Sequence, residues 1–225
     1  MSVPPERLAR WLLGFAERHD GATASYDGNV VRLAGGDGAV AEVEVPFGAL
    51  LLDVPDDDAP VGQRDAGDDL TAGQRYSAAL VAHCLRERRI GVLLVRLGGH
   101  AAGVFEGRRL VSSKVGSRQV HGRSAAGGWS QQRFARRREG QVSVALGAAA
   151  DNAATHLLPQ APTLEGVVVG GERTAVEAVL ADRRLAALRP LITGRLLDVP
   201  DPRLVVLRGA GDLARLVQIR VLDAG

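Results

Sequence analysis

Two glutamines lie between a glycine pair and a run of arginines in the segment GGWSQQRFARRRE, residues 127–139. A glutamine amide does not titrate in water, but it can hold a water molecule and a carbonyl group at the same time. The glycines allow backbone conformations closed to other residues and let a bulky partner approach the main chain. Such a combination is typical of a site that positions water for hydrolysis rather than one that performs acid–base catalysis.

Positive charge is concentrated around this segment. Between Gly107 and Gly140 there are nine basic residues and one acid, although the net charge of the whole chain is only +2. Seven aspartates, in contrast, lie within residues 53–69. Basic side chains three and four positions apart share one face of a helix, where they can bind phosphates, so the clustering favours an RNA partner. The candidate RNA-binding residues are Lys114, Arg118, Arg123, Arg133, Arg136, Arg137 and Arg138.

The bulk composition limits the class of protein. With 225 residues, 46% of them apolar, the chain can form one large domain or two small ones. No apolar run is long enough to span a bilayer, and the N-terminus lacks a signal-peptide pattern. A single cysteine, Cys84, fits a reducing compartment. We therefore expect a cytoplasmic protein without membrane association; nothing in the sequence fixes its oligomeric state.

The sequence indicates neither a metal nor a cofactor. The five histidines and Cys84 lack the spacing of metal ligands. The pair Gly170–Gly171, between an expected strand and an expected helix, could bind an anion at the helix N-terminus. A tight strand-to-helix turn is the simpler interpretation of these two glycines.

The first part of the chain predicts a small α+β unit at residues 1–52. Residues 4–18 have the spacing of an amphipathic helix, and residues 22–48 alternate apolar and polar side chains around turns, which predicts two or three antiparallel strands. The apolar face of the helix contains Leu8, Trp11, Leu12 and Phe15. Residues 53–69, rich in Asp, Pro and Gly, follow as an acidic linker or loop.

Residues 70–225 predict a mixed α/β domain that carries the Gly-Gly loop at 121–132. A helix at 70–89 and a strand at 90–98 come first, and a hairpin leads into the loop. The elements expected after the loop are a helix from about Ser130 to Leu158, weakened at Gly140 and Gly147, then a strand, a further helix, and a strand at 203–209.

The segment resembles the Gly-Gly-Gln loop of the middle domain of eukaryotic and archaeal class-I release factors. There the loop runs into a helix of the form Ser-x-x-Arg-Phe-Ala-Arg-x-Arg. The matching residues here are Ser130, Arg133, Phe134, Ala135, Arg136 and Arg138. The similarity extends over roughly residues 90–198, about half of the chain. It implies an α/β fold with a ribonuclease-H-like mixed sheet and flanking helices.

One position departs from this pattern. Release factors place glutamine directly after the glycines, whereas this chain has Trp129, followed by Ser130 and then Gln131 and Gln132. The shift is similar to the Vms-like release factors. These include the eukaryotic ankyrin-repeat and zinc-finger peptidyl-tRNA hydrolase of ribosome quality control, and an actinobacterial branch.

The resemblance to the Vms-like family implies the release of nascent chains from peptidyl-tRNA on stalled large ribosomal subunits. Ribosomal RNA would be a further partner, and no cofactor is implied. Gly127, Gly128, Trp129 and Ser130 would form the loop tip. Gln131 is the first choice for the catalytic amide, and Gln132 is the alternative.

Two other functions fit the same residues. The protein could bind the ribosome or tRNA as a rescue factor without performing chemistry, as do members of the superfamily that lack the glutamine. It could also be a tRNA nuclease, for which His121 is the candidate histidine. Substitution of the glutamines separates these functions, because only the hydrolase would lose activity and keep its RNA binding.

Overall fold

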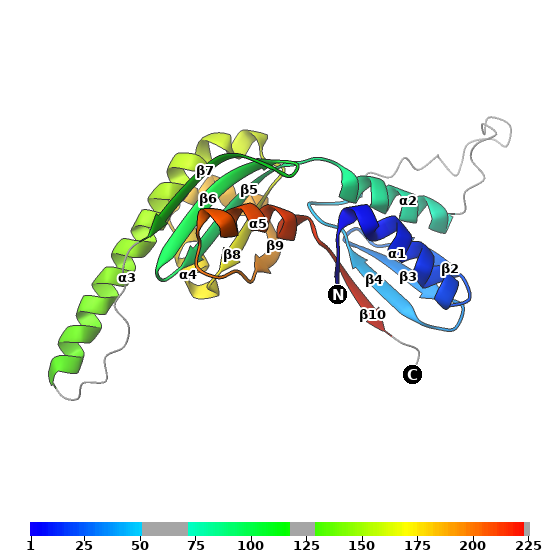
Figure 1. Ribbon diagram of the computed structural model, residues 1–225, viewed down its shortest axis with the longest axis horizontal. Coiled ribbons are helices and arrows are strands. Elements are labelled where there is room, and N and C mark those ends of the chain that lie inside the picture. The colour runs from blue at the N-terminus through cyan, green and yellow to red at the C-terminus, as the bar shows by residue number, and fades with distance from the viewer. Residues whose placement is uncertain (51–71, 118–128, 223–225) are drawn as a thin grey trace. The chain divides into compact units, whose positions relative to one another are not determined.

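The computed structural model describes residues 1–50, 72–117 and 129–222. The chain divides into two compact units: Met1–Arg86 together with Arg215–Gly225, and Glu87–Ala214. Within the described ranges each unit is built on its own five-stranded sheet (Figure 1).

The first unit packs α1 (Pro5–Arg18) and α2 (Ala72–Leu85) against an antiparallel sheet. The strands, in spatial order, are β1 (Ser2–Val3), β10 (Val217–Leu222), β4 (Val40–Glu44), β3 (Val30–Gly35) and β2 (Ala22–Tyr26). Helix α1 buries Leu8, Leu12 and Phe15, with Trp11 partly buried beside them, so the predicted amphipathic helix is confirmed. The two or three antiparallel strands predicted for residues 22–48 are observed as β2, β3 and β4.

The outer face of this sheet is polar. Strand β3 alternates buried and exposed residues, as expected for a sheet with one face in solvent. Glu42 of β4 lies opposite Arg32 of β3 and Arg220 of β10. Its carboxylate accepts hydrogen bonds from Arg32 Nη2 at 2.8 Å and from Arg220 Nε at 3.0 Å. These contacts, Arg220 foremost, lower the pKa of Glu42.

The second unit contains a mixed sheet. Its strands, in spatial order, are β7 (Arg109–Ser117), β6 (Gly99–Glu106), β5 (Arg89–Arg96), β8 (Gly166–Gly171) and β9 (Ile192–Leu197). Strands β5, β6 and β7 are antiparallel neighbours, whereas β8 is parallel to β5 and β9 is parallel to β8. This order and direction of strands is the ribonuclease-H-like arrangement that the resemblance implies.

Helices cover both faces of this sheet. On one face, α3 (Trp129–His156) and α4 (Arg173–Leu180) share a core with β5, β6 and β8, and the 3₁₀ segments η1 (Leu158–Thr163) and η2 (Arg183–Leu191) pack at their ends. On the other face, α5 (Leu204–Arg215) places Leu207 and Gly211 against Gly103 and Phe105 of β6. Strand β5 is therefore buried along nearly its whole length, as expected for a strand covered on both sides.

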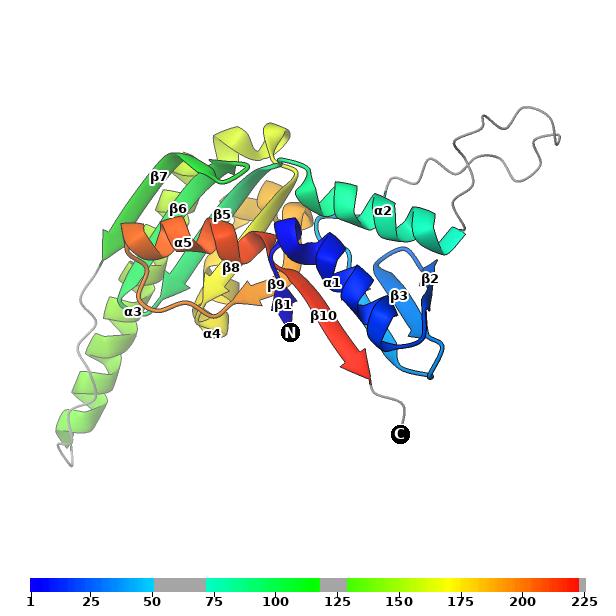
Figure 2. The same ribbon diagram turned by 45° about the vertical axis from the view of Figure 1, so that its right-hand side comes forward.

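The long helix predicted from about Ser130 to Leu158 is confirmed as α3, which has 28 residues. Gly140 and Gly147 lie within it and do not interrupt it. The C-terminal half of α3 packs on the sheet, and its N-terminal half projects past the strands (Figures 1 and 2). Helix α3 ends at His156, shortly before Pro159 in η1, because proline cannot continue a helix.

The structure differs from the expectations in three places. Residues 203–209, expected as a strand, lie largely in α5, because the apolar positions that become buried recur with helical spacing. Strands β9 and β10 were not predicted. Helix α2 and β10 belong to the first unit, so the second unit begins at Glu87 rather than at residue 70. The expected linker at 53–69 lies outside the described residues.

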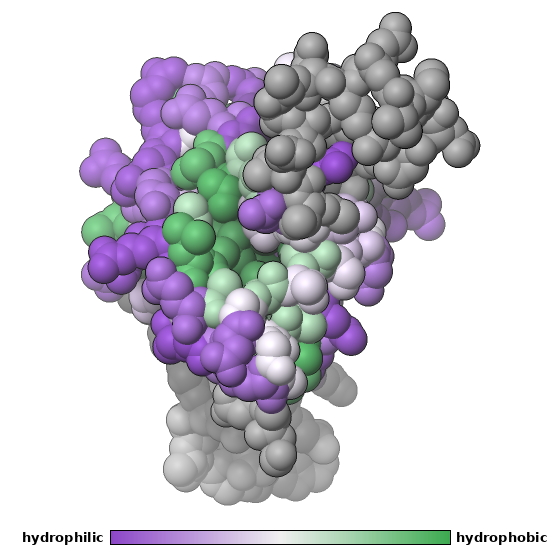
Figure 3. All heavy atoms as spheres, turned by 90° about the vertical axis from the view of Figure 1, so that its right-hand side faces the viewer, coloured by the Kyte–Doolittle hydropathy of each residue, from purple (hydrophilic) through white to green (hydrophobic). Residues whose placement is uncertain are grey.

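Figure 3 shows a patch of hydrophobic residues on one face, bordered by hydrophilic residues. Patches of this kind are common on protein surfaces. Among the residues that the structure describes, each helix is too short or too polar to cross a lipid bilayer.

Candidate functional site

The sequence segment singled out by its glycines and glutamines connects β7 to α3. Strand β7 ends at Ser117 and α3 begins at Trp129. Four of the predicted site residues lie between these points, outside the described part of the chain: Arg118, Arg123, Gly127 and Gly128. The candidate nuclease residue His121 lies there too.

The segment at residues 127–139 is called the motif from here on. Its residues from Trp129 onward belong to α3. Trp129, Ser130, Gln131 and Gln132 form its first turn, so the helix begins directly after the glycine pair, within the last part of the range 121–132 predicted for the loop. These four residues contain no glycine or proline that would stop a helix. Backbone N–H groups in the first turn have no acceptor within the helix and can bind an oxygen atom that carries negative charge.

The arginines of the motif follow in the next two turns of α3. Arg133, Arg136, Arg137 and Arg138 are all helical, as predicted. Their side-chain positions, like those of all residues from 129 to 138, lie outside what the structure describes. The confirmed part of the prediction is therefore the helical backbone that carries them.

Lys114 is the one candidate RNA-binding residue whose side chain falls in the described ranges. It is exposed on β7, and its register partner on β6 is Ala102. Because paired residues of neighbouring strands point to the same face, Lys114 shares the face of the sheet on which α3 packs. A basic side chain thus lies on the surface beside the helix that carries the motif.

The base of α3 is held close to the sheet by small side chains. Ala149, Ala150 and Ala153, in the C-terminal half of the helix that forms this base, are buried in the core shared with β5, β6 and β8. Between them lies Asn152, which is 7% exposed, and its Nδ2 donates a hydrogen bond of 3.2 Å to the backbone oxygen of Lys114. The amide joins the helix to the strand that leads into the motif.

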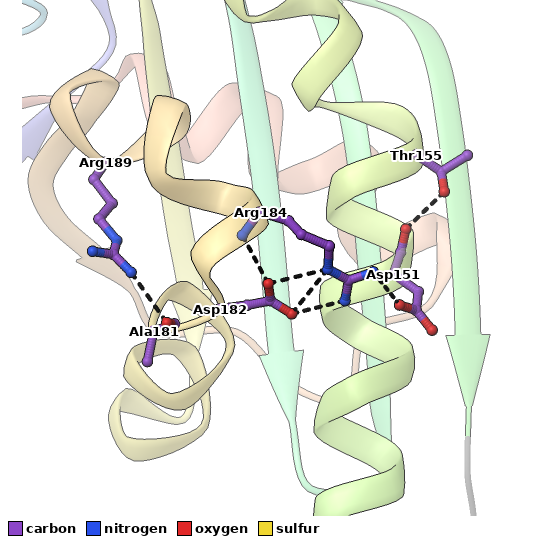
Figure 4. Close-up of polar contacts among 6 residues, drawn as sticks. All are labelled: Asp151, Thr155, Ala181, Asp182, Arg184 and Arg189. Carbon is purple, nitrogen blue, oxygen red and sulfur yellow. Dashed lines mark hydrogen bonds and ion pairs between the residues drawn. The ribbon is translucent and has the colours of Figure 1, made fainter.

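A charged cluster holds the same turn of α3 from another side (Figure 4). Arg184 of η2 contacts Asp151 at 2.8 Å and Asp182 at 2.7 Å, and its backbone N–H also donates to Asp182. These hydrogen bonds, Arg184's side chain first, lower the pKa of Asp182 to about 2 and raise that of Arg184. The side chains of Arg184 and Asp151 are more than half exposed and that of Asp182 is 25% exposed, so solvent screens these pairs and they contribute little to stability.

A buried histidine lies at the end of the β6–β7 hairpin nearest the motif. His100 of β6 is 7% exposed and is paired with Gly116, the penultimate residue of β7. Any side chain at Gly116 would overlap the His100 ring, so glycine is required at this position. The described residues contain no group of three side chains that could hold a metal ion.

The Gly170–Gly171 pair is explained by packing. Gly171 has φ +104°, and a methyl group there would overlap the backbone oxygen of Val95. That oxygen accepts a hydrogen bond of 2.9 Å from the N–H of Glu172, where the chain turns into α4. The tight turn thus accounts for Gly171, and a methyl group at Gly170 would crowd the side chains of Leu94 and Leu197.

Comparison with solved structures finds partial likenesses. The crystal structure of the archaeal translation termination factor aRF1 is 20% identical, with a TM-score of 0.43 over 56% of this chain and 36% of that one. A second archaeal protein is 22% identical, with a TM-score of 0.41 over 60% and 35%. The Vms1 mitochondrial localization core is 9% identical, with a TM-score of 0.40 over 95% and 81%. This chain spans about a third of the length of the two archaeal proteins.

Comparison with curated proteins finds no match. The comparison with protein families does: residues 88–220, which comprise the motif, α3 and the whole mixed sheet, match the family described as the Actinobacteria/chloroflexi VLRF1 release factor. Since that match covers more than half of its residues, the chain belongs to the acVLRF1 family of release factors.

Proposed function

We propose that this release factor is a cytoplasmic peptidyl-tRNA hydrolase that frees nascent chains on stalled large ribosomal subunits. The observation that carries the proposal is the position of Gln131 and Gln132, in the first turn of a helix that projects from the core of a release-factor chain (Figure 2). A projecting helix can carry a small reactive tip into a site enclosed by RNA while the body of the protein stays outside.

Hydrolysis by such a site depends on positioning. The glutamine amide would hold a water molecule against the ester carbonyl that links the peptide to the terminal ribose. Water adds to the carbonyl carbon, the bond to the ribose 3′-oxygen breaks, and RNA or solvent supplies the proton to the leaving oxygen. A free N–H in the first turn of α3 could bind the oxyanion, and one such donor typically contributes about 10²- to 10³-fold in rate.

Basic residues on both sides of the motif would bind the RNA. Lys114 on β7 and the arginines of α3 flank the predicted tip along the chain, and counterion release from RNA phosphates would supply much of the affinity. Trp129 could stack on a base, which typically contributes about 1–3 kcal/mol. In this proposal the large subunit, its ribosomal RNA and peptidyl-tRNA are the partners, and the Gly-Gly pair lets the chain pass between nucleotides.

The test is peptide release from purified large subunits that carry a labelled peptidyl-tRNA, measured under single-turnover conditions. Gln131→Ala, Gln132→Ala and the double variant are compared with the wild type, and binding to the same particles is measured by sedimentation. Gln141→Ala, on the same helix ten residues further on, is the matched control. Gel analysis of the tRNA follows any strand cleavage in wild type and His121→Ala.

We expect one of the two single glutamine variants to bind normally and to release peptide about 10²-fold more slowly than the wild type. Gln141→Ala should bind and release peptide as the wild type does. Adjacent helical positions lie about 100° apart around the axis, so the two glutamines cannot substitute for each other. If the wild type binds without releasing peptide, or if all variants release equally, the glutamines are not catalytic and the non-catalytic rescue factor is the better description. Cleaved tRNA that depends on His121 would favour the nuclease.

A further inference from the structure

Helix α3 places the glutamines far from the turns that pack on the sheet. Gln131 lies twenty-one positions before Asn152, or about 32 Å along the helix axis. A tilt of about 2° at Asn152 would therefore move Gln131 by about 1 Å, and a displacement of that size can slow catalysis about 10²-fold. The location of the catalytic amide depends on how firmly the base of α3 is fixed.

The apolar side chains that α3 itself places in this core are mostly small. Ala149, Ala150 and Ala153 belong to the core shared with the sheet, and Leu146 is only partly buried against it. Methyl groups present a smooth surface without the interlocking shapes that give a core one well-defined arrangement. Small shifts or tilts of the helix would disturb few of these contacts.

Asn152 interrupts this alanine surface with a directional contact. It belongs to the same helical stripe, and its Nδ2 binds the backbone oxygen of Lys114 at 3.2 Å. Because the atom opposite is a carbonyl oxygen, only the NH₂ end of the amide can face it, so the orientation of the amide is settled. Its Oδ1 is buried and has no hydrogen-bond partner among the described residues.

An unpaired buried oxygen destabilises a protein, and a leucine of similar size would avoid this cost. A polar group retained in a core despite such a cost is suited to specifying one arrangement of packed elements over others. The partner strand fits that role, since β7 carries the chain into the motif and α3 carries it out. One hydrogen bond therefore links the two elements that flank the motif.

We propose that Asn152 is a positioning residue for peptide release, whose hydrogen bond to β7 sets the register and tilt of α3 and so the location of Gln131 and Gln132. The proposal rests on the hydrolase function proposed above. Asp151, the adjacent residue, provides the matched control: it also ties α3 to a neighbour, Arg184, but its side chain is 67% exposed and its contact is easily replaced by water.

The experiment compares Asn152→Leu and Asn152→Ala with Asp151→Asn in the full chain. The position of α3 is measured as the distance between spin labels at Ser113→Cys on β7 and Glu139→Cys on α3, with Cys84 replaced by alanine; both labelled residues are exposed. Thermal stability is recorded for each variant. Single-turnover release from large-subunit–peptidyl-tRNA particles then gives the maximal rate and the half-saturating concentration separately.

Asn152→Leu is expected to unfold at or above the wild-type temperature, to broaden or shift the label distances, and to lower the maximal release rate by about tenfold or more at an unchanged half-saturating concentration. Asn152→Ala also removes the hydrogen bond but adds no bulk. It should therefore show the same change in label distances and in release rate, even if leucine itself disturbs the packing. Asp151→Asn should resemble the wild type in all measurements.

Unchanged label distances in both Asn152 variants would overturn the proposal, as would a release defect that merely parallels a loss of stability and of binding. A wild-type protein that releases no peptide would remove the hydrolase function, but the label distances would still decide whether Asn152 fixes α3. The two proposals can therefore fail separately.

Discussion

Within the described residues the two sheets of this protein each have five strands, but they bury their side chains differently. Residues 90–95 of β5, in the second unit, are all buried, because α3 and α4 cover one face and α5 covers the other. Strand β3, in the first unit, alternates, with Val31 and Leu33 buried and Arg32 and Ala34 exposed. The sheet of the second unit is an internal layer, whereas the sheet of the first unit has one face in solvent.

This difference in burial indicates that the two sheets have different structural roles. The sheet covered on both faces is the base from which α3 projects, and a projecting helix requires a support that does not deform. The half-exposed sheet instead presents Arg32, Glu42 and Arg220 to solvent in neighbouring strands. Packing constrains nearly every position of β5, but only every second position of β3.

The largest effect is expected from glycines that look alike by backbone angle alone. Gly171, in the second unit, has φ +104° and lies against Val95; Gly28, in the first unit, has φ +89° and open space around it. Alanine at Gly171 must both strain the backbone and displace β5, which should cost at least about 3 kcal/mol of unfolding free energy. At Gly28 only the strain remains, about 1–2 kcal/mol. Urea denaturation measures both, and equal losses would contradict the packing argument.

A scan with asparagine sharpens the comparison of the sheets. Leu93→Asn and Leu94→Asn, on opposite faces of β5, should each cost about 2–4 kcal/mol, because both place an amide in an apolar core. In β3, Leu33→Asn should cost a similar amount, while Ala34→Asn should stay within about 0.5 kcal/mol. Amide hydrogen exchange of β3 and β5 reports each unit separately. Tolerance of Leu94→Asn would show that the α5 face is not a closed core.

The smallest effect on stability is expected from the ion pair between Asp182 and Arg184. The pKa of Asp182 is lowered from 3.8 to about 2 by its hydrogen bonds with Arg184. A carboxylate with a lowered folded-state pKa stabilises the fold above its unfolded-state pKa and loses that contribution as pH falls through the folded-state value. The melting temperature of the wild type should therefore drop relative to Asp182→Asn between about pH 4 and pH 2, and the two should run parallel above pH 5. A constant difference at every pH would contradict the assigned pair.

Elements with strong local patterns were predictable from the sequence. The apolar run of β5, the hairpin around Gly107 and the long periodic stretch of α3 each identify themselves within a few residues. Strand β10 has an alternating pattern too, but its place between β1 and β4 could not be predicted, because those strands lie far away in the chain. The start of α5 misled for a different reason: two adjacent valines favour a strand locally, and the helical spacing appears only when the buried small residues downstream are included.

The candidate site was predictable in its residue types more than in its support. The glycines, glutamines and arginines were identified by chemistry and spacing, whereas Asn152 was not, because asparagine within a helix usually faces water. A signal did exist: Asn152 lies three positions after Ala149, which is buried in the core against the sheet, so the spacing puts Asn152 on the inward side of the helix. A polar residue at an inward position of an otherwise alanine-lined stripe is the pattern to look for.

The place of β10 in the first sheet has a consequence for synthesis of the chain on the ribosome. Residues 217–222 pair with β4 on one side and β1 on the other, so the first sheet is incomplete until these residues have been translated. The second unit lies entirely within residues 87–214 and can form before those last strand residues emerge. A nascent chain halted shortly before Val217 would therefore combine a foldable second unit with a first unit that lacks one of its strands.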